Sequence, residues 1–149
     1  MLWLINPLLK NEGIIITNNI NFNRWLMIDA LQIEQALINL LTNSLYALQN
    51  TGTKHIEISA EIKNDRLFIL ISDSGPGIDK AIEDKIFLPF FTTRNDGAGI
   101  GLTLSRNIIE AMAATLIISY RIIKLYLPYA FCNNKISNNE KKKFISHLN

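Results

Sequence analysis

The chain has 149 residues, a length that favours a single domain, and its formal net charge of +2 provides no broad basic field for duplex nucleic acid. Its composition, with 48% hydrophobic and 19% charged residues, is typical of a globular protein. A single cysteine and two histidines, His55 and His147, exclude a disulfide framework and a multi-histidine metal site.

The apolar segments do not predict a membrane span. Residues 1–9 are fewer than the roughly 20 that a spanning helix needs, and no basic segment or cleavage site marks them as a signal peptide. The later apolar stretch, residues 116–127, is interrupted by Arg121 and Lys124. We therefore expect a cytoplasmic chain.

The first predicted elements are a strand and a long helix. Residues 14–17 are a β-branched run that predicts a strand, and the Asn and Thr residues that follow to residue 23 predict a loop. Apolar residues recur at helical spacing over 29–49, with Asp29 as the expected N-cap and Gly52 as the expected stop.

A hairpin and an irregular segment follow. Residues 55–62 alternate and predict a half-buried strand, and the uninterrupted apolar run 67–71 predicts a central strand covered on both faces. Residues 73–101 contain five of the seven glycines, which indicates a long functional loop. Helical spacing then returns over 102–112, and a strand is expected over 115–119.

Three clusters carry residue types suited to a nucleotide. Asn39 and Asn43 lie four apart on one helix face, where their amides are either ligands for Mg²⁺ and its waters or solvated groups. Asp73 follows the central strand within D-S-G-P-G-I, where it either accepts a hydrogen bond from an adenine amine or begins a tight turn. The glycines of 97–101 precede a helix and either expose N–H groups to phosphate or form a flexible loop.

The segment between the glycine clusters leaves two further alternatives open. Phe87, Phe90 and Phe91 form either a hydrophobic plug or a surface for a partner. Arg94 either reaches a terminal phosphate or remains solvated.

Four segments together resemble, in order and spacing, the ATP-binding domain of bacterial sensor histidine kinases, within the wider group that includes gyrase and MutL. Residues 33–48 are similar to the N box, 86–94 to the F box, and 73–78 and 97–102 to the two glycine boxes. The resemblance implies a Bergerat-type ATP-binding fold: an α/β (α+β) two-layer sandwich of a mixed sheet and a helical layer, with a mobile lid.

The resemblance also implies the cofactors, ATP and Mg²⁺, and the site. Asn43 becomes the Mg²⁺-associated residue, Asp73 contacts adenine, and Asn39 lies where gyrase-type relatives place a catalytic glutamate. The residues so assigned to the nucleotide are Asn39, Asn43, Asp73, Gly75, Gly77, Ile78, Thr93, Arg94, Gly97, Gly99, Ile100, Gly101 and Leu102.

The resemblance implies that the γ-phosphoryl group of ATP is transferred to a histidine on a separate dimerisation domain. That domain then passes the phosphoryl group to a response regulator. Neither His55 nor His147 lies in the sequence context of that acceptor histidine, so we expect the chain to contain the ATP-binding half alone.

The alternative function is that of a non-catalytic remnant that binds nucleotide or a partner. A gyrase-type ATPase is disfavoured because Asn39 cannot accept a proton, and a nucleic-acid module built on Lys141–Lys143 is least favoured.

Three departures from the family pattern carry expectations of their own. Ala113-Ala114 replaces a Gly-Gly pair, which predicts backbone strain. Residues 120–128 resemble one strand without its preceding turn, so we expect an incomplete last hairpin, a domain over 1–120 and an atypical or disordered tail over 121–149. Tyr46 stands where many relatives have a charged residue near the phosphates.

Overall fold

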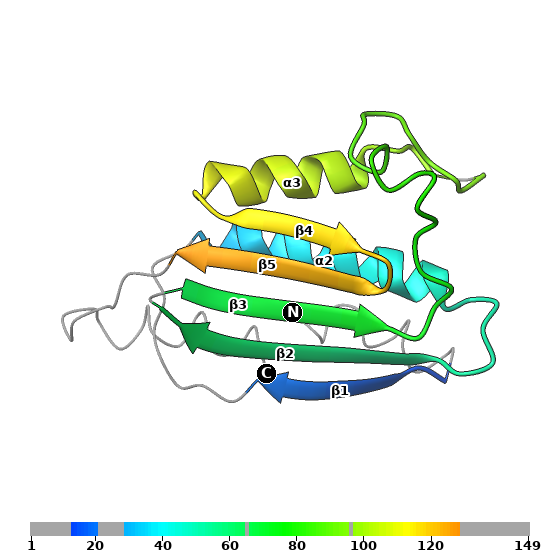
Figure 1. Ribbon diagram of the computed structural model, residues 1–149, viewed down its shortest axis with the longest axis horizontal. Helices are drawn as coiled ribbons and strands as arrows, with labels where there is room; N and C mark the ends of the chain where they lie inside the picture. The colour runs from blue at the N-terminus through cyan, green and yellow to red at the C-terminus, as the bar shows by residue number, and fades with distance from the viewer. Residues whose placement is uncertain (1–12, 21–28, 65, 96, 129–149) are drawn as a thin grey trace.

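The computed structural model describes residues 13–20, 29–64, 66–95 and 97–128 (Figure 1). Its elements are β1 (Ile15–Ile20), α2 (Ala30–Ala47), β2 (His55–Lys63), β3 (Arg66–Asp73), α3 (Gly101–Ala111), β4 (Thr115–Ser119) and β5 (Ile122–Pro128). The five strands form one sheet in the order β1-β2-β3-β5-β4, with only β1 and β2 parallel. The two helices pack on each other and on one face of this sheet, which confirms the expected two-layer α/β fold.

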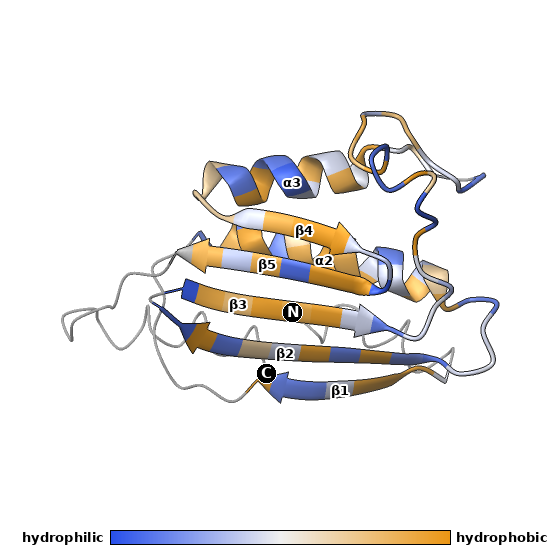
Figure 2. Ribbon diagram, in the orientation of Figure 1, coloured by the Kyte–Doolittle hydropathy of each residue, from blue (hydrophilic) through white to orange (hydrophobic). Residues whose placement is uncertain are grey.

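The core lies between the sheet and α2. Alternate residues of β2, β3 and β5 are apolar and buried against the helices. The hydropathy colouring in Figure 2 shows that apolar residues predominate along β3. The central position expected for the strand over 67–71 is confirmed. The prediction that this strand is covered on both faces is wrong, because Phe68 and Leu70 point to the outer face and remain partly exposed.

The boundaries of the early elements differ from the sequence expectation at two places. Asp29 caps α2 as expected, since its Oδ1 accepts hydrogen bonds from the backbone N–H groups of Leu31 and Gln32, each 3.1 Å away. The helix ends at Ala47, so Gly52 is not its stop. Strand β1 runs through Asn18 and Asn19, where the sequence predicted a loop, because parallel pairing with β2 provides partners for its backbone.

The expectation of an incomplete last hairpin is wrong. Strands β4 and β5 are paired up to Ser119 and Ile122, and Tyr120 and Arg121 alone form the turn. Two residues suffice for an antiparallel hairpin, and Tyr120 itself adopts the positive φ (45°) for which glycine is usually selected. The tail was expected over 121–149, but residues 121–128 belong to the hairpin and the sheet, so the boundary expected at residue 120 is wrong. The rest of that expected tail, residues 129–149, lies outside the described residues.

The strain expected at the Ala113-Ala114 pair is confirmed at Ala113, whose φ is 54°. The N–H of Ala113 donates to the carbonyl of Glu110 (3.0 Å), and that of Ala114 donates to Ile109 (3.1 Å). This pattern ends a helix with one left-handed residue, a position where glycine is strongly favoured. Of the described helices, neither has the length and apolar character needed to cross a bilayer.

We expect Ala113→Gly to stabilise the chain by about 1 kcal/mol, because the left-handed conformation disfavours a Cβ and the exposed Ala113 methyl group contributes little packing. Thermal unfolding should show a rise in Tm of roughly 3–4 °C. The matched control is Ala111→Gly, the same change inside α3, which should lower Tm. A fall in Tm for Ala113→Gly would contradict this account of the helix end.

Candidate functional site

One face of α2 forms the wall of the candidate site. Asn39, Asn43, Tyr46 and Ala47 recur at helical spacing and therefore point to the same side of the helix. Three segments that are distant in sequence contact this face: the start of α3, the loop after β3 and the segment around Arg94.

Asn39 joins α2 to the start of α3. Its Nδ2 donates hydrogen bonds to the carbonyl of Gly101 and to Oγ of the fully buried Ser105, the latter at 2.8 Å. A Cβ on Gly101 would lie 2.7 Å from Asn39 Oδ1, so this approach requires glycine. The interpretation of Asn39 as a solvated amide is therefore wrong. Asn43, one turn further along α2, is half-buried.

Asp73 ends β3 and begins the loop that contains Gly75 and Gly77. Its Oδ1 accepts a hydrogen bond from the Gly75 N–H (2.9 Å), while Oδ2 has no hydrogen-bond partner among the described residues. A Cβ on Gly75 would lie 2.8 Å from Asp73 Oδ1 and 3.1 Å from the Ala47 methyl group. Oδ1 of Asp73 therefore stabilises the tight turn, and Oδ2 can accept a hydrogen bond from a further donor.

Ser74 anchors the same loop to the start of β2. Its hydroxyl accepts from the His55 N–H (3.0 Å) and donates to the Thr53 carbonyl (2.7 Å). The Ser74 N–H also donates to the His55 carbonyl (3.0 Å). The loop is thus held on the sheet side while Gly75 lies against α2.

The segment around Arg94 is also placed against α2. The Arg94 guanidinium lies over the Tyr46 ring, with Cζ 4.0 Å from the ring centroid, and the Arg94 N–H donates to Thr92 Oγ1 (3.0 Å). The interpretation of Arg94 as a merely solvated cation is therefore wrong, and its contact with a phosphate stays a prediction. Thr93 is exposed.

The glycines before α3 allow close backbone packing. Gly99 has a φ of 67°, its carbonyl accepts from the Phe90 N–H (2.8 Å), and a Cβ there would lie 2.5 Å from the Phe90 carbonyl carbon. A Cβ on Gly97 would lie 2.6 Å from Thr92 Oγ1. These contacts favour an ordered turn over the flexible loop that the sequence left open.

The start of α3 lacks a capping side chain. Ile100, its N-cap residue, is 49% exposed and makes no side-chain cap hydrogen bond. The N–H groups of the first turn are thus available to an anion, and the helix dipole favours a negative charge there. The side chains of Leu102 and Ile78 pack against the core, so they fix the segments that carry the site to the core.

Of the three phenylalanines at residues 87, 90 and 91, two form the expected hydrophobic plug and one is placed as expected for a partner surface. Phe87 and Phe91 pack against the core, and the Arg106 guanidinium lies over the Phe87 ring, 3.4 Å from its centroid. Phe90 is 79% exposed. Two of the rings therefore act as a plug, and only Phe90 offers an open aromatic surface.

The residues fit Mg²⁺ and an adenine nucleotide. Asn43 offers an amide oxygen of the kind that a hard cation accepts, and no donor of the described residues bonds to Asp73 Oδ2. Beside Asn43, the Ser44 hydroxyl is 2% exposed and has no hydrogen-bond partner in the described part of the chain. Ser44 lies in the buried stripe of α2 with Leu41 and Leu48, so it faces the core and not the site. Sequence reasoning missed Ser105, whose buried hydroxyl accepts a hydrogen bond from Asn39 and so holds α3 against α2.

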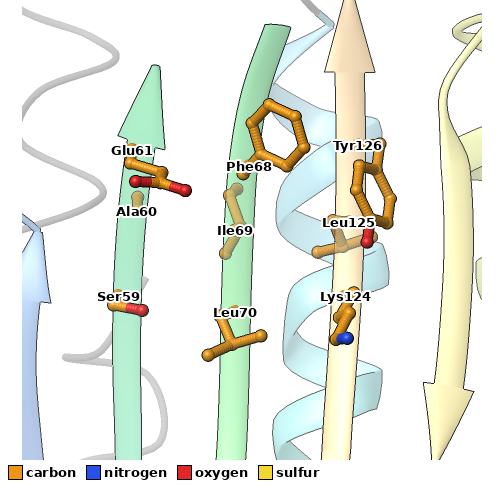
Figure 3. Close-up of a pocket in the computed structure, with 9 residues that line it drawn as sticks. All are labelled: Ser59, Ala60, Glu61, Phe68, Ile69, Leu70, Lys124, Leu125 and Tyr126. Carbon is orange, nitrogen blue, oxygen red and sulfur yellow. The ribbon is translucent and has the colours of Figure 1, made fainter. Parts of the chain in front are cut away.

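A separate hollow of about 320 Å³ lies on the outer face of the sheet (Figure 3). It is lined by side chains and backbone of β2, β3 and β5, among them Phe68 and Tyr126, whose rings meet edge to face at 5.0 Å. Its backbone groups are engaged in the strand ladders, so it offers no uncapped N–H groups for phosphate. None of the site residues predicted from the sequence lines it.

Similar proteins include several sensor kinases. The sensor histidine kinase ZraS of Salmonella typhimurium is 42% identical over 79 residues, 53% of this chain and 17% of that protein. The C4-dicarboxylate transport sensor protein DctB of Rhizobium meliloti is 34% identical over 86 residues, 58% of this chain. The chain thus spans less than a fifth of the length of these relatives, 17% and 14% respectively.

The fold and the sequence both match catalytic domains of known structure. The catalytic domain of the histidine kinase ThkA aligns with a TM-score of 0.74 and 29% identity, over 85% of this chain and 86% of that one. Full-length ShkA in complex with AMPPNP aligns with a TM-score of 0.73 at 22% identity, a likeness of fold alone. The profile described as "Histidine kinase-, DNA gyrase B-, and HSP90-like ATPase" matches residues 28–144. The chain therefore belongs to this ATPase family.

Proposed function

We propose that this chain is the ATP-binding catalytic domain of a sensor histidine kinase. In this role it transfers the γ-phosphoryl group of ATP to a histidine on a separate dimerisation domain, which then passes it to a response regulator. The observation that carries the proposal is the convergence of Gly75, Gly101 and Arg94 on one face of α2. The similar sensor kinases support the same assignment.

The proposed adenine end is the loop after β3. Asp73 Oδ2 accepts a hydrogen bond from the exocyclic amine of adenine, and Gly75 and Gly77 let the backbone approach the flat ring. Ile78 packs behind the loop and limits the depth of the site.

The proposed phosphate end is the start of α3. The backbone N–H groups of Gly99–Leu102 contact the phosphates, and Gly97 shapes the turn before them, since its own N–H donates to the Arg94 carbonyl (3.4 Å). Thr93 and Arg94 approach the phosphates from the expected lid, residues 86–96. Asn43 holds Mg²⁺ directly or through its waters, and the ion supplies neutralisation of phosphate charge when bound. Asn39 acts indirectly, because its hydrogen bond to Gly101 sets where α3 begins.

These groups position substrates and neutralise charge, which is what phosphoryl transfer requires of a protein. The bond between the γ-phosphorus and the bridging oxygen breaks, ADP leaves, and a bond forms from phosphorus to an imidazole nitrogen of the acceptor. Asn39 cannot act as a general base for water, so ATP hydrolysis is disfavoured. Because ATP is the substrate, we also propose a cytoplasmic location.

A second candidate is a nucleotide-binding module without transfer activity. The observation that favours it is the contact between Tyr46 and Arg94, which holds this cation on α2 rather than leaving it for a phosphate. The two candidates share the nucleotide site and differ only in phosphoryl transfer.

We expect Mg²⁺–ATP to stabilise the chain and Asp73→Asn to lose most of that stabilisation. At about 100 times the dissociation constant, the ligand should add about 2.7 kcal/mol, a Tm rise of roughly 5–10 °C. Asn at residue 73 keeps the oxygen that Gly75 uses but presents an NH₂ donor to the adenine amine.

Glu61→Gln is the matched control for this thermal-shift measurement. It removes the same charge from an exposed residue on the outer face of the sheet and should keep the full shift. An equal Tm rise in the Asp73→Asn variant would contradict the assignment of adenine to Asp73.

Phosphoryl transfer is tested with radiolabelled ATP, Mg²⁺ and a histidine-containing dimerisation domain from a similar sensor kinase. We expect acid-labile label on the supplied domain, and no label when Asn43→Ala replaces the unaltered chain. ATP binding without any transfer would contradict the kinase assignment and favour the nucleotide-binding module.

A further inference from the structure

The two-residue turn between β4 and β5 holds both ends of the loop over residues 73–78. The N–H of Ile78 donates to the Tyr120 carbonyl (3.0 Å), and the N–H of Asp73 donates to the Arg121 carbonyl (3.3 Å). The loop that begins with Asp73 is therefore hydrogen-bonded to the turn at its first and last residues.

The Tyr120 ring covers Gly77 within that loop. A Cβ on Gly77 would lie 2.6 Å from both Cδ2 and Cε2 of Tyr120, and Gly77 has a φ of 81°. The Arg121 guanidinium lies over the same ring, 5.0 Å from its centroid. Gly77 thus combines a backbone conformation typical of glycine with an aromatic ring packed where a side chain would be.

Tyr120 adopts a conformation that its own backbone disfavours. Its φ of 45° is uncommon for any residue with a Cβ, and its side chain is 59% exposed, so burial of the ring does not explain its presence. Strained residues of this kind persist when the surrounding contacts require them. The two-residue hairpin turn requires a positive φ at this position, but it does not require an aromatic residue. The ring is the part of Tyr120 that the turn leaves unexplained, and it contacts Gly77 and the Arg121 guanidinium.

We propose that Tyr120 is a positioning residue for nucleotide recognition, which holds the 73–78 loop in the shape that presents Asp73 to adenine. The inference rests on the proposed function, because it assumes that this loop is the adenine end. It adds that the short turn between β4 and β5 determines adenine affinity without touching the nucleotide.

The test compares Tyr120→Gly with the unaltered chain. Glycine at residue 120 relieves the backbone strain and removes the ring, so we expect Tm to hold or rise while the affinity for Mg²⁺–ATP falls roughly tenfold. The affinity for Mg²⁺–tripolyphosphate, measured by competition, should not change, because it lacks the adenine that Asp73 contacts. An equal fall in the affinity of Tyr120→Gly for both ligands would overturn the proposal. An unchanged affinity of this variant for Mg²⁺–ATP would overturn it as well.

Three further variants separate the ring from the backbone. Tyr120→Phe keeps the ring and should bind ATP as the unaltered chain does. Tyr120→Asn tolerates positive φ without a ring and should behave as Tyr120→Gly does. Ala113→Gly relieves similar strain away from the loop and should leave ATP affinity unchanged. Equal losses of affinity in the Phe and Gly variants would overturn the role of the ring.

Amide hydrogen exchange in the ligand-free chain separates this proposal from the proposed function. We expect faster exchange at Ile78 in Tyr120→Gly and not in Tyr120→Phe or Ala113→Gly. Unchanged exchange would overturn the positioning role whatever the chain binds. Failure of the unaltered chain to bind Mg²⁺–ATP, with faster exchange in Tyr120→Gly, would instead refute the proposed function.

Discussion

The close approach of three backbone segments to one face of α2 is the constraint on which the rest of the site depends. Gly101 and Gly75 each lie so near α2 that a Cβ would come within about 3 Å of an Asn39 or Ala47 atom. A Cβ at either residue would require its neighbours to shift, so glycine favours this close packing. The distance between the loop after β3 and the turn before α3 is therefore set by one helix, which packs on the sheet (Figure 1).

The proposed nucleotide site contains few reactive groups, which fits a reaction that depends on positioning and on charge neutralisation. Within the part of the chain that the structure describes, the first turn of α3 has no capping side chain and Asp73 Oδ2 has no hydrogen-bond partner. Each is an incompletely satisfied polar group, which costs stability in the free protein and gains a partner when a ligand binds. Both groups belong to segments that contact α2, which is why we propose one nucleotide as the ligand for both.

Local features of the site were predictable from the sequence, whereas its long-range contacts were not. Capping by Asp29, the alternation of β2 and the order of the four boxes depend on neighbouring residues, so the pattern alone indicated them. The bond from Asn39 to Ser105 and the stacking of Arg94 on Tyr46 join distant segments that no periodicity links. The last hairpin was missed because Tyr120 occupies a turn position for which the sequence rules expect glycine.

The most direct test of the central claim is a titration of the isotope-labelled chain with Mg²⁺ and a non-hydrolysable ATP analogue, followed by amide NMR. We expect the amide signals of Gly75, Gly77, Gly99 and Gly101 to shift together with one dissociation constant, while the amide signals of residues that line the outer hollow, such as Ser59 and Tyr126, stay unchanged. Shifts confined to the outer face of the sheet, or separate dissociation constants for the two loops, would contradict a single nucleotide site on α2.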